Sequence, residues 1–132
     1  MNHTPAYPPD HAPIILVVDD TFINREFMEA ALQTVGYTVL LASNAERAWQ
    51  LIQQTQPDAV LVDVRMSYET EGYDLCQRIK STLHTAHIKV AMLTALDTPL
   101  DRDYAEQAGA DTFISRTLDL RALLAAIAQL LP

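Results

Sequence analysis

The sequence predicts a single doubly wound α/β domain, in which a five-stranded parallel sheet carries helices on both faces. Short apolar segments rich in β-branched residues alternate five times with segments of helical periodicity. The apolar segments are continuous rather than alternating, which is typical of parallel strands buried on both faces. At 132 residues, with 49% hydrophobic and 20% charged composition, the chain suits one globular core.

The first strand is expected over residues 13–18, after a Pro-rich segment. Residues 1–12 are predicted to be a disordered tail, so the domain is assigned to residues 13–132. The helix after the first strand is expected to end at Gly36, a residue that accepts the left-handed conformation. Its apolar stripe has helical spacing and consists of Met28, Ala31, Leu32 and Val35.

The second unit is a strand over 37–42 followed by a helix. Ser43 and Glu46 have the spacing of a capping box, which predicts Ser43 as the N-cap. Pro57 interrupts the helical pattern and the third strand follows over 58–63. The stripe of this second helix is Ala45, Ala48, Trp49 and Ile52.

The remaining elements follow the same alternation. The third helix is expected to begin near Gly72, with an apolar stripe at Leu75, Cys76, Ile79 and Leu83. Strands are expected over 88–94 and 111–115. Thr98 and Pro99 fit the N-cap and first position of a fourth helix that ends at Gly109. The last helix is capped by Asp119 and its stripe is Leu120, Leu123, Leu124, Ile127, Leu130 and Leu131.

Composition and charge exclude several classes of function. The net charge is −8 and the nine basic residues are dispersed, so direct nucleic-acid binding is not expected. Cys76 is the only cysteine, which excludes an intramolecular disulfide and fits a reducing compartment. The N-terminus lacks the pattern of a signal peptide, and no apolar run approaches the roughly 18 residues of a membrane span. We therefore expect a cytoplasmic protein that does not contact membranes.

Polar residues stand at the ends of several predicted strands. Asp19 and Asp20 follow the first strand, Asp63 ends the third, Thr94 the fourth, and Arg116 follows the fifth. In doubly wound sheets, ligands bind at this carboxyl edge. Adjacent aspartates alone are more often solvated turn residues, but three converging carboxylates repel one another unless a cation lies among them. An all-oxygen site beside water suits Mg²⁺.

Four motifs give the chain a family resemblance. In the order VVDD (17–20), VLVDVRM (60–66), MLTA (92–95) and GADTFIS (109–115), the sequence resembles the receiver domain of two-component response regulators, a flavodoxin-like fold. The resemblance covers about residues 13–131. It implies that Asp63 is the phosphoacceptor and that Thr94 bonds a phosphoryl oxygen. The implied Mg²⁺ ligands are Asp19, Asp20, Asp63 and the backbone carbonyl of Arg65.

The resemblance also implies a signalling cycle. A carboxylate attacks a dianionic phosphoryl group poorly, so transfer depends on positioning and charge neutralisation, which a metal supplies. The donor would be a phosphohistidine on a histidine kinase or phosphotransfer protein, and water would later hydrolyse the acyl phosphate. The chain would thus be a switch rather than an enzyme. Thr94 and Phe113 would move, and the face of the fourth helix, fifth strand and last helix would report the change and offer a homodimer surface.

The sequence departs from the family pattern in two places. Arg116-Thr117 replaces the usual Lys-Pro, so the peptide there is expected to be trans, because a cis bond without proline costs roughly 3 kcal/mol. Arg116 would still present a positive fork to phosphoryl oxygens. Ser67 replaces a usual proline in a loop one residue longer than normal. Arg65, two residues after the acceptor, is expected to overhang the site, and Arg65→Ala is predicted to change the dephosphorylation rate.

Other interpretations remain open. A pseudo-receiver would bind partners without being phosphorylated. Independently of that alternative, Phe113 fits an ordinary core position as well as a switch role. An enzyme of another doubly wound class is disfavoured because no Gly-rich loop follows the first strand. His84 and His87 could be imagined as a metal pair, but a solvated loop is favoured because no third ligand lies nearby in the sequence.

Overall fold

The computed structural model describes residues 12–64, 66, 70–94 and 98–132, which form one parallel sheet with helices packed against it. The strand order is β2-β1-β3-β4-β5, and all neighbouring strands are parallel. The strands are β1 (Ile14–Val18), β2 (Thr38–Ala42), β3 (Ala59–Asp63), β4 (Lys89–Thr94) and β5 (Thr112–Ser115). The helices are α1 (Phe22–Gln33), α2 (Ala45–Thr55), α3 (Glu71–Ser81), α4 (Pro99–Gln107) and α5 (Leu120–Leu130). The predicted doubly wound fold is confirmed.

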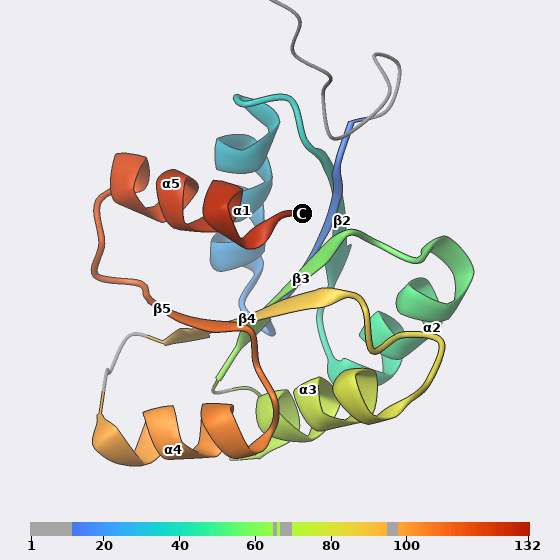
Figure 1. Cartoon of the computed structure of the whole chain (residues 1–132). Helices are drawn as coiled ribbons and strands as arrows, with labels where there is room; N and C mark the ends of the chain where they lie inside the picture. Colours follow the sequence, from blue (N-terminus) through green and yellow to red (C-terminus); the bar gives the residue numbers. More distant parts are fainter. Residues whose placement is uncertain (1–11, 65, 67–69, 95–97) are drawn as a thin grey trace, which may run out of the picture.

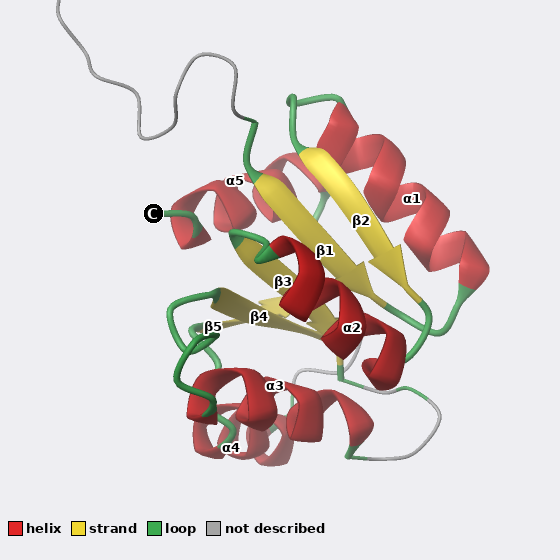
Figure 2. Ribbon diagram, turned by 90° about the vertical axis from the view of Figure 1, so that its right-hand side faces the viewer, coloured by secondary structure: helices red, strands yellow, loops and turns green. Residues whose placement is uncertain are grey.

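The helices cover both faces of the sheet. Helices α1 and α5 lie on one face, and α2, α3 and α4 lie on the other (Figures 1 and 2). Successive strand residues point to opposite faces, so Ile15 and Val17 pack toward α1 and α5, while Leu16 and Val18 pack toward α2 and α3. All four side chains are fully buried. Burial on both faces explains why the strands are continuously apolar.

Glycines terminate two helices just beyond their last turns, as predicted. Gly36 and Gly109 have φ values of +92° and +86°, in the left-handed region. The N–H of Gly36 donates to the carbonyl of Gln33, and the N–H of Tyr37 donates to that of Leu32. This pair of bonds is a Schellman motif, and it satisfies carbonyls that the helix leaves unpaired.

Two of the predicted N-caps are confirmed. The Thr98 hydroxyl accepts a hydrogen bond from the N–H of Asp101 at 3.1 Å, with Pro99 at the first helical position. The Asp119 carboxylate accepts from the N–H of Ala122 at 2.8 Å. Each side chain satisfies one backbone donor that the first turn leaves free.

The predicted capping box at Ser43 is wrong. The N-cap of α2 is Asn44, whose side-chain oxygen accepts from the N–H of Arg47 at 2.8 Å. Serine and asparagine are both favourable caps, and Asn44 has the extended backbone that the position needs. The helix therefore begins one residue later than the box implies.

Three members of the predicted apolar stripes lie outside their helices. Val35 is 50% exposed because α1 ends at Gln33, and Leu83 is 95% exposed because α3 ends at Ser81. The helical spacing continues past both helix ends, although the backbone does not. The predictions for Val35 and Leu83 are wrong. Leu131 follows the end of α5 at Leu130 but still packs against the core on the α1 and α5 face. The other stripe positions lie within their helices.

Two further predictions concern the ends of the chain and membranes. The tail predicted over residues 1–12 lies outside the described residues, except for Ala12. Its disorder therefore stays a prediction. Among the helices in the described ranges, none has both the length and the apolar character that crossing a bilayer requires.

Candidate functional site

Three aspartates meet at the carboxyl edge of the sheet. Strands β1 and β3 are neighbours, so Asp19 and Asp20 lie next to Asp63, and one oxygen from each lies within 4.8 Å of the others. Asp19 is buried, Asp63 is partly buried and Asp20 is exposed, so the cluster opens to solvent on one side. Among the described residues this is the one such group of three metal-ligating side chains, and neither His84 nor His87 belongs to one. The predicted convergence is confirmed.

The buried carboxylate of Asp19 is held by its surroundings. Its Oδ1 atom accepts from the N–H of Thr21 at 2.9 Å. Its backbone N–H donates to the carbonyl of Ala42 at 3.1 Å, and its own carbonyl accepts from the guanidinium of Arg25 at 2.9 Å. These bonds fix the position of a charge that burial would otherwise destabilise. The sequence did not indicate the part played by Thr21 and Arg25, which depends on the turn after β1.

Arg116 reaches the acidic cluster from the end of β5. Its backbone N–H donates to the carbonyl of Thr94 at 2.6 Å, which continues the pairing of β4 and β5. The guanidinium donates to Oδ2 of Asp19 at 2.5 Å, and its Nε lies 4.0 Å from Oδ1 of Asp63. The structure therefore brings Arg116 to the site, in contact with a carboxylate that the sequence had assigned to the metal.

The turn after Arg116 is built without proline. The structure shows no cis peptide bond among the residues it describes, so the bond to Thr117 is trans, as predicted. The N–H of Thr117 donates to the hydroxyl of Ser115 at 3.2 Å, and the N–H of Leu118 to the carbonyl of Ser115 at 3.3 Å. A proline at position 117 could not make the first of these bonds.

Thr94 and Phe113 occupy neighbouring strands. Asp63 pairs in register with Leu93, so Thr94 lies one residue further along the same edge and is 2% exposed. Phe113 is partly buried against the core cluster on the α2, α3 and α4 face, with the guanidinium carbon of Arg102 5.2 Å from its ring centroid. Both residues lie where the sequence placed them, and their switch roles stay predictions.

Two features of the chain after Asp63 concern the site. Arg65, the predicted carbonyl ligand, and Ser67 lie outside the described residues, so their roles stay predictions. A Cβ atom added at Gly72 would lie 2.3 Å from the backbone carbonyl oxygen of Asp63. The first turn of α3 thus packs directly against the end of β3, and only glycine allows this approach. The sequence singled out Gly72 as a helix start, not as a support of the site.

The cluster fits a hard divalent cation. Its donors are carboxylate oxygens, it borders solvent, and the Arg116 guanidinium pairs with two of its three carboxylates. Mg²⁺ prefers oxygen ligands and keeps several waters, which the exposed side of the cluster allows. The residues present therefore match the chemistry that Mg²⁺ requires.

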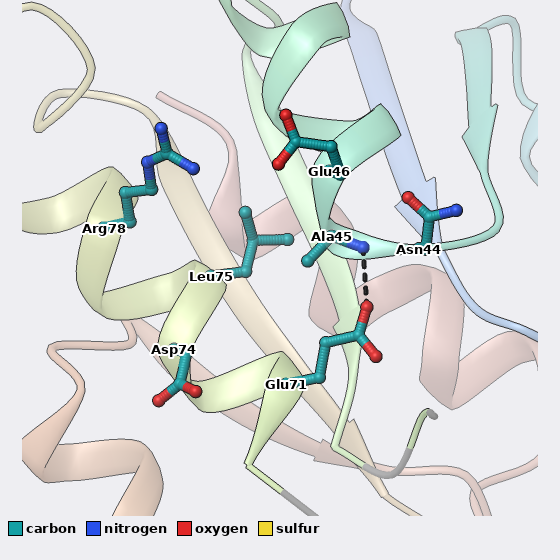
Figure 3. A pocket seen from close by; sticks show the side chains of 7 residues that line it. All are labelled: Asn44, Ala45, Glu46, Glu71, Asp74, Leu75 and Arg78. Atoms are coloured by element: carbon teal, nitrogen blue, oxygen red, sulfur yellow. Dashed lines mark hydrogen bonds between the residues drawn. The ribbon is translucent and has the colours of Figure 1, made fainter. Parts of the chain in front are cut away.

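A hollow of about 280 Å³ lies between α2 and α3, away from this cluster (Figure 3). Glu71, at the start of α3, is 4% exposed, and its carboxylate accepts from the N–H of Ala45 at 2.8 Å. The bond ties the first turns of the two helices together. The hollow is lined by Asn44, Ala45, Glu46, Glu71, Asp74, Leu75 and Arg78.

Comparison with known proteins agrees with this geometry. The family described as the response regulator receiver domain matches residues 15–128. Response regulator MprA of Mycolicibacterium vanbaalenii is 37% identical over 89% of this chain and 49% of its own length. The DNA-binding dual master transcriptional regulator RpaA of Synechocystis is 32% identical over 90% of this chain and 49% of its own length. The chain thus spans about half the length of these relatives.

A solved structure agrees over nearly its whole length. The receiver domain of a signal transduction histidine kinase from Syntrophus aciditrophicus is 31% identical, with a TM-score of 0.82. The similarity covers 90% of this chain and 89% of that one. Fold, acidic cluster and family match all agree, and the chain belongs to the response regulator receiver domain family.

Proposed function

We propose that this domain accepts a phosphoryl group on Asp63, in a Mg²⁺-dependent reaction, and acts as a two-component or phosphorelay switch. The observation that supports this most directly is the convergence of Asp19, Asp20 and Asp63 within 4.8 Å. Two carboxylates beside the acceptor are repulsive for phosphoryl transfer unless a cation neutralises them. Bound Mg²⁺ would supply that neutralisation, with Asp19, Asp20 and Asp63 as its protein ligands and the Arg65 carbonyl as a fourth.

The proposed transfer uses few protein groups. A carboxylate oxygen of Asp63 forms the new bond to phosphorus while the bond from phosphorus to the donor's histidine nitrogen breaks, and the imidazole leaves. Thr94 and Arg116 would bond the phosphoryl oxygens, since both stand at the same sheet edge as Asp63. Positioning and electrostatics account for most of the catalysis in such transfers.

The phosphorylated state of Asp63 would end by hydrolysis of the acyl phosphate. Water attacks phosphorus, Asp63 is regenerated and inorganic phosphate leaves, so one phosphorylation event produces one switching event rather than sustained turnover. Arg65→Ala is predicted to change this rate. In the phosphorylated state Thr94 would approach the phosphoryl group, and Phe113 would repack toward the space it leaves.

The rim of the site supports a protein partner. Phe22 and Ile23 directly follow the acidic turn and are 65% and 75% exposed, and Leu118, just after Arg116, is 42% exposed. Exposed apolar side chains beside a reactive group favour a docked protein surface over free solvent. We infer that this partner is a histidine kinase or histidine phosphotransfer protein. The exchange would take place in the cytoplasm, which fits the single free thiol of Cys76.

Direct nucleic-acid binding by this domain is not part of the proposal. RpaA is named as a DNA-binding protein, but the present chain matches only 49% of its length. The net charge of −8 opposes the phosphate contacts on which DNA affinity depends. The name of RpaA describes that whole protein and does not assign DNA binding to the domain that this chain matches.

The experiment is intact-mass spectrometry after incubation with a small phosphoryl donor and Mg²⁺. Wild type is expected to gain one phosphoryl group, and Asp63→Asn none, because the amide lacks the nucleophilic carboxylate. Omitting Mg²⁺ should abolish the gain in wild type. Phosphorylation of Asp63→Asn at the same rate would contradict the assignment of the acceptor.

A second candidate, the pseudo-receiver, is favoured by one observation. Arg116 already pairs with Asp19, a contact that competes with the proposed metal ligation. If wild type gains no phosphoryl group while Mg²⁺ still binds, the domain would be a phosphorylation-independent interaction module.

A further inference from the structure

Arg116 occupies the carboxylates that the proposed cation would use. Oδ1 of Asp19 accepts from the N–H of Thr21 at 2.9 Å, and Oδ2 accepts from Arg116 at 2.5 Å. Asp19 is fully buried, so both of its oxygens are engaged by protein groups. The same guanidinium lies 4.0 Å from Asp63 and thereby bridges two of the three acidic ligands.

A metal ion and this guanidinium oppose each other at Asp19. Mg²⁺ binds oxygen at about 2.1 Å, so an ion on the same Asp19 oxygen would lie less than about 5 Å from the Arg116 nitrogen. A divalent cation and a guanidinium repel strongly at that distance in a partly buried site. Both cannot hold the same oxygen without a large loss of affinity.

The arginine has a route out of the site. Its backbone is fixed by the bond to Thr94, but its side chain is 20% exposed, so a change of rotamer can take the guanidinium toward solvent without disturbing the core. A guanidinium released from Asp19 would leave that oxygen to the metal, while the backbone of Arg116 stays at the sheet edge that holds Asp63, the proposed acceptor. The movement would therefore free a metal ligand and a phosphoryl ligand together.

We propose that Arg116 is a built-in counter-ion that competes with Mg²⁺ for Asp19 and must leave it when the metal binds. The inference rests on the metal site of the proposed function and adds a specific role for the arginine that replaces the usual lysine. Arginine suits this role because its planar fork reaches further than an ammonium and can address two carboxylates. The domain would bind Mg²⁺ more weakly than its three carboxylates alone would allow.

The test is a Mg²⁺ titration of the full chain by calorimetry, without a phosphoryl donor. Arg116→Gln is expected to raise the affinity for Mg²⁺ at least about tenfold, because the competitor is removed. Arg25→Gln is the matched control, since Arg25 also contacts Asp19, but through the backbone carbonyl at 2.9 Å rather than the carboxylate. Arg25→Gln removes the same charge without freeing a ligand oxygen, so its gain in Mg²⁺ affinity should stay below about threefold.

Three outcomes would overturn the proposed competition between Arg116 and Mg²⁺. Equal gains in Mg²⁺ affinity in Arg116→Gln and Arg25→Gln would show that net charge alone causes the effect. No gain in Arg116→Gln would show that Arg116 does not compete with the metal. Arg116→Lys keeps the charge while shortening the reach to Asp19, so it covers the case in which the glutamine variant does not fold, and it should also gain affinity. In wild type, the Nε–H resonance of Arg116 should shift with the same midpoint as metal binding. An unmoved resonance would also refute the proposal.

The test separates this inference from the proposed function. Competition at Asp19 is read from metal affinity, and phosphorylation of Asp63 is read from mass. A chain that shows the affinity pattern but accepts no phosphoryl group would retain the competition and lose the proposed function. The reverse result would retain phosphorylation and reject the role of Arg116.

Discussion

At the scale of single residues, the site is defined by how a buried charge is compensated. Asp19 is 0% exposed, and a carboxylate removed from water is costly unless it is paired and hydrogen-bonded. Thr21 supplies a neutral donor and Arg116 a charged one. Removing Arg116 therefore has two effects, which are to leave a buried charge without its cationic partner and to free a ligand oxygen. Mg²⁺ should accordingly stabilise Arg116→Gln more than it stabilises wild type.

Cys76 gives a residue-scale prediction about reactivity and pH. Burial, reinforced by the nearby charge of Asp111 and partly opposed by Lys80, raises the pKa of its thiol from 9.0 to about 12. Between pH 9 and about 12, the folded chain therefore keeps the thiol proton that the unfolded chain loses. The stability contribution is full below pH 9 and is lost as pH rises toward about 12. Urea unfolding on either side of pH 9 should show that the free energy of unfolding falls more steeply with rising pH in wild type than in Cys76→Ala.

The same thiol should be inert in the native state. A thiolate is the reactive form, so alkylation near neutral pH should be slow in the folded chain and fast in urea. Equal rates in the two conditions would contradict the assigned burial. The packing role that the sequence predicted for Cys76 in α3 is confirmed by its full burial.

At the scale of elements, the contact between α3 and β3 determines where the acceptor lies. A Cβ at position 72 would meet the Asp63 carbonyl at 2.3 Å, so Gly72→Ala should displace the start of α3 or the end of β3. We expect a loss of about 2 kcal/mol in unfolding free energy. We also expect weaker Mg²⁺ binding and slower phosphorylation. Denaturant unfolding and the mass assay measure these effects.

Gly36 is the matched control for this substitution. Its φ of +92° makes alanine unfavourable by about 1 kcal/mol, yet nothing lies within 4 Å of the added Cβ. Gly36→Ala should therefore lower stability while leaving Mg²⁺ binding and phosphorylation unchanged. If both variants impair the site equally, the effect comes from general destabilisation rather than from the contact with Asp63.

Local patterns predicted elements better than they predicted the contacts between them. Strands and glycine stops depend on neighbouring residues, so they could be read from the sequence. The Ala45 N–H donates to Glu71 and the Tyr73 hydroxyl donates to Asp101, bonds that join residues 26 and 28 positions apart, and no local pattern encodes them. Asp101 lies in the first turn of α4, where it is 3% exposed and accepts a hydrogen bond from the Tyr73 hydroxyl at 3.1 Å.

At the scale of the whole molecule, topology explains why the site could be located at all. Parallel strands bring their carboxyl ends to one edge, so Asp19, Asp20 and Asp63 had to converge once the fold was assigned. The partner chosen by Arg116 could not be predicted in the same way. Its contact with Asp19 spans 97 residues and depends on the rotamer of a long side chain.

The predicted homodimer face is the other whole-molecule feature. Strand β5 is the edge of the sheet, flanked by α4 on one face and α5 on the other (Figure 1). On α4, Leu100 and Tyr104 lie one turn apart and are 61% and 44% exposed. Apolar side chains beside an edge strand favour association with a second copy. We expect phosphorylation to increase dimerisation through this face, because the proposed repacking of Phe113 takes place in β5.

Sedimentation velocity of the phosphorylated chain tests this expectation. Wild type should shift from monomer toward dimer on phosphorylation, and a Leu100→Lys, Tyr104→Lys double variant should remain monomeric, because lysine places charge in the contact. Leu83→Lys is the control, since Leu83 is 95% exposed in the connection between α3 and β4, outside the predicted dimer face. It should dimerise like wild type. Loss of the dimer in Leu83→Lys, or its persistence in the double variant, would place the interface elsewhere on the molecule.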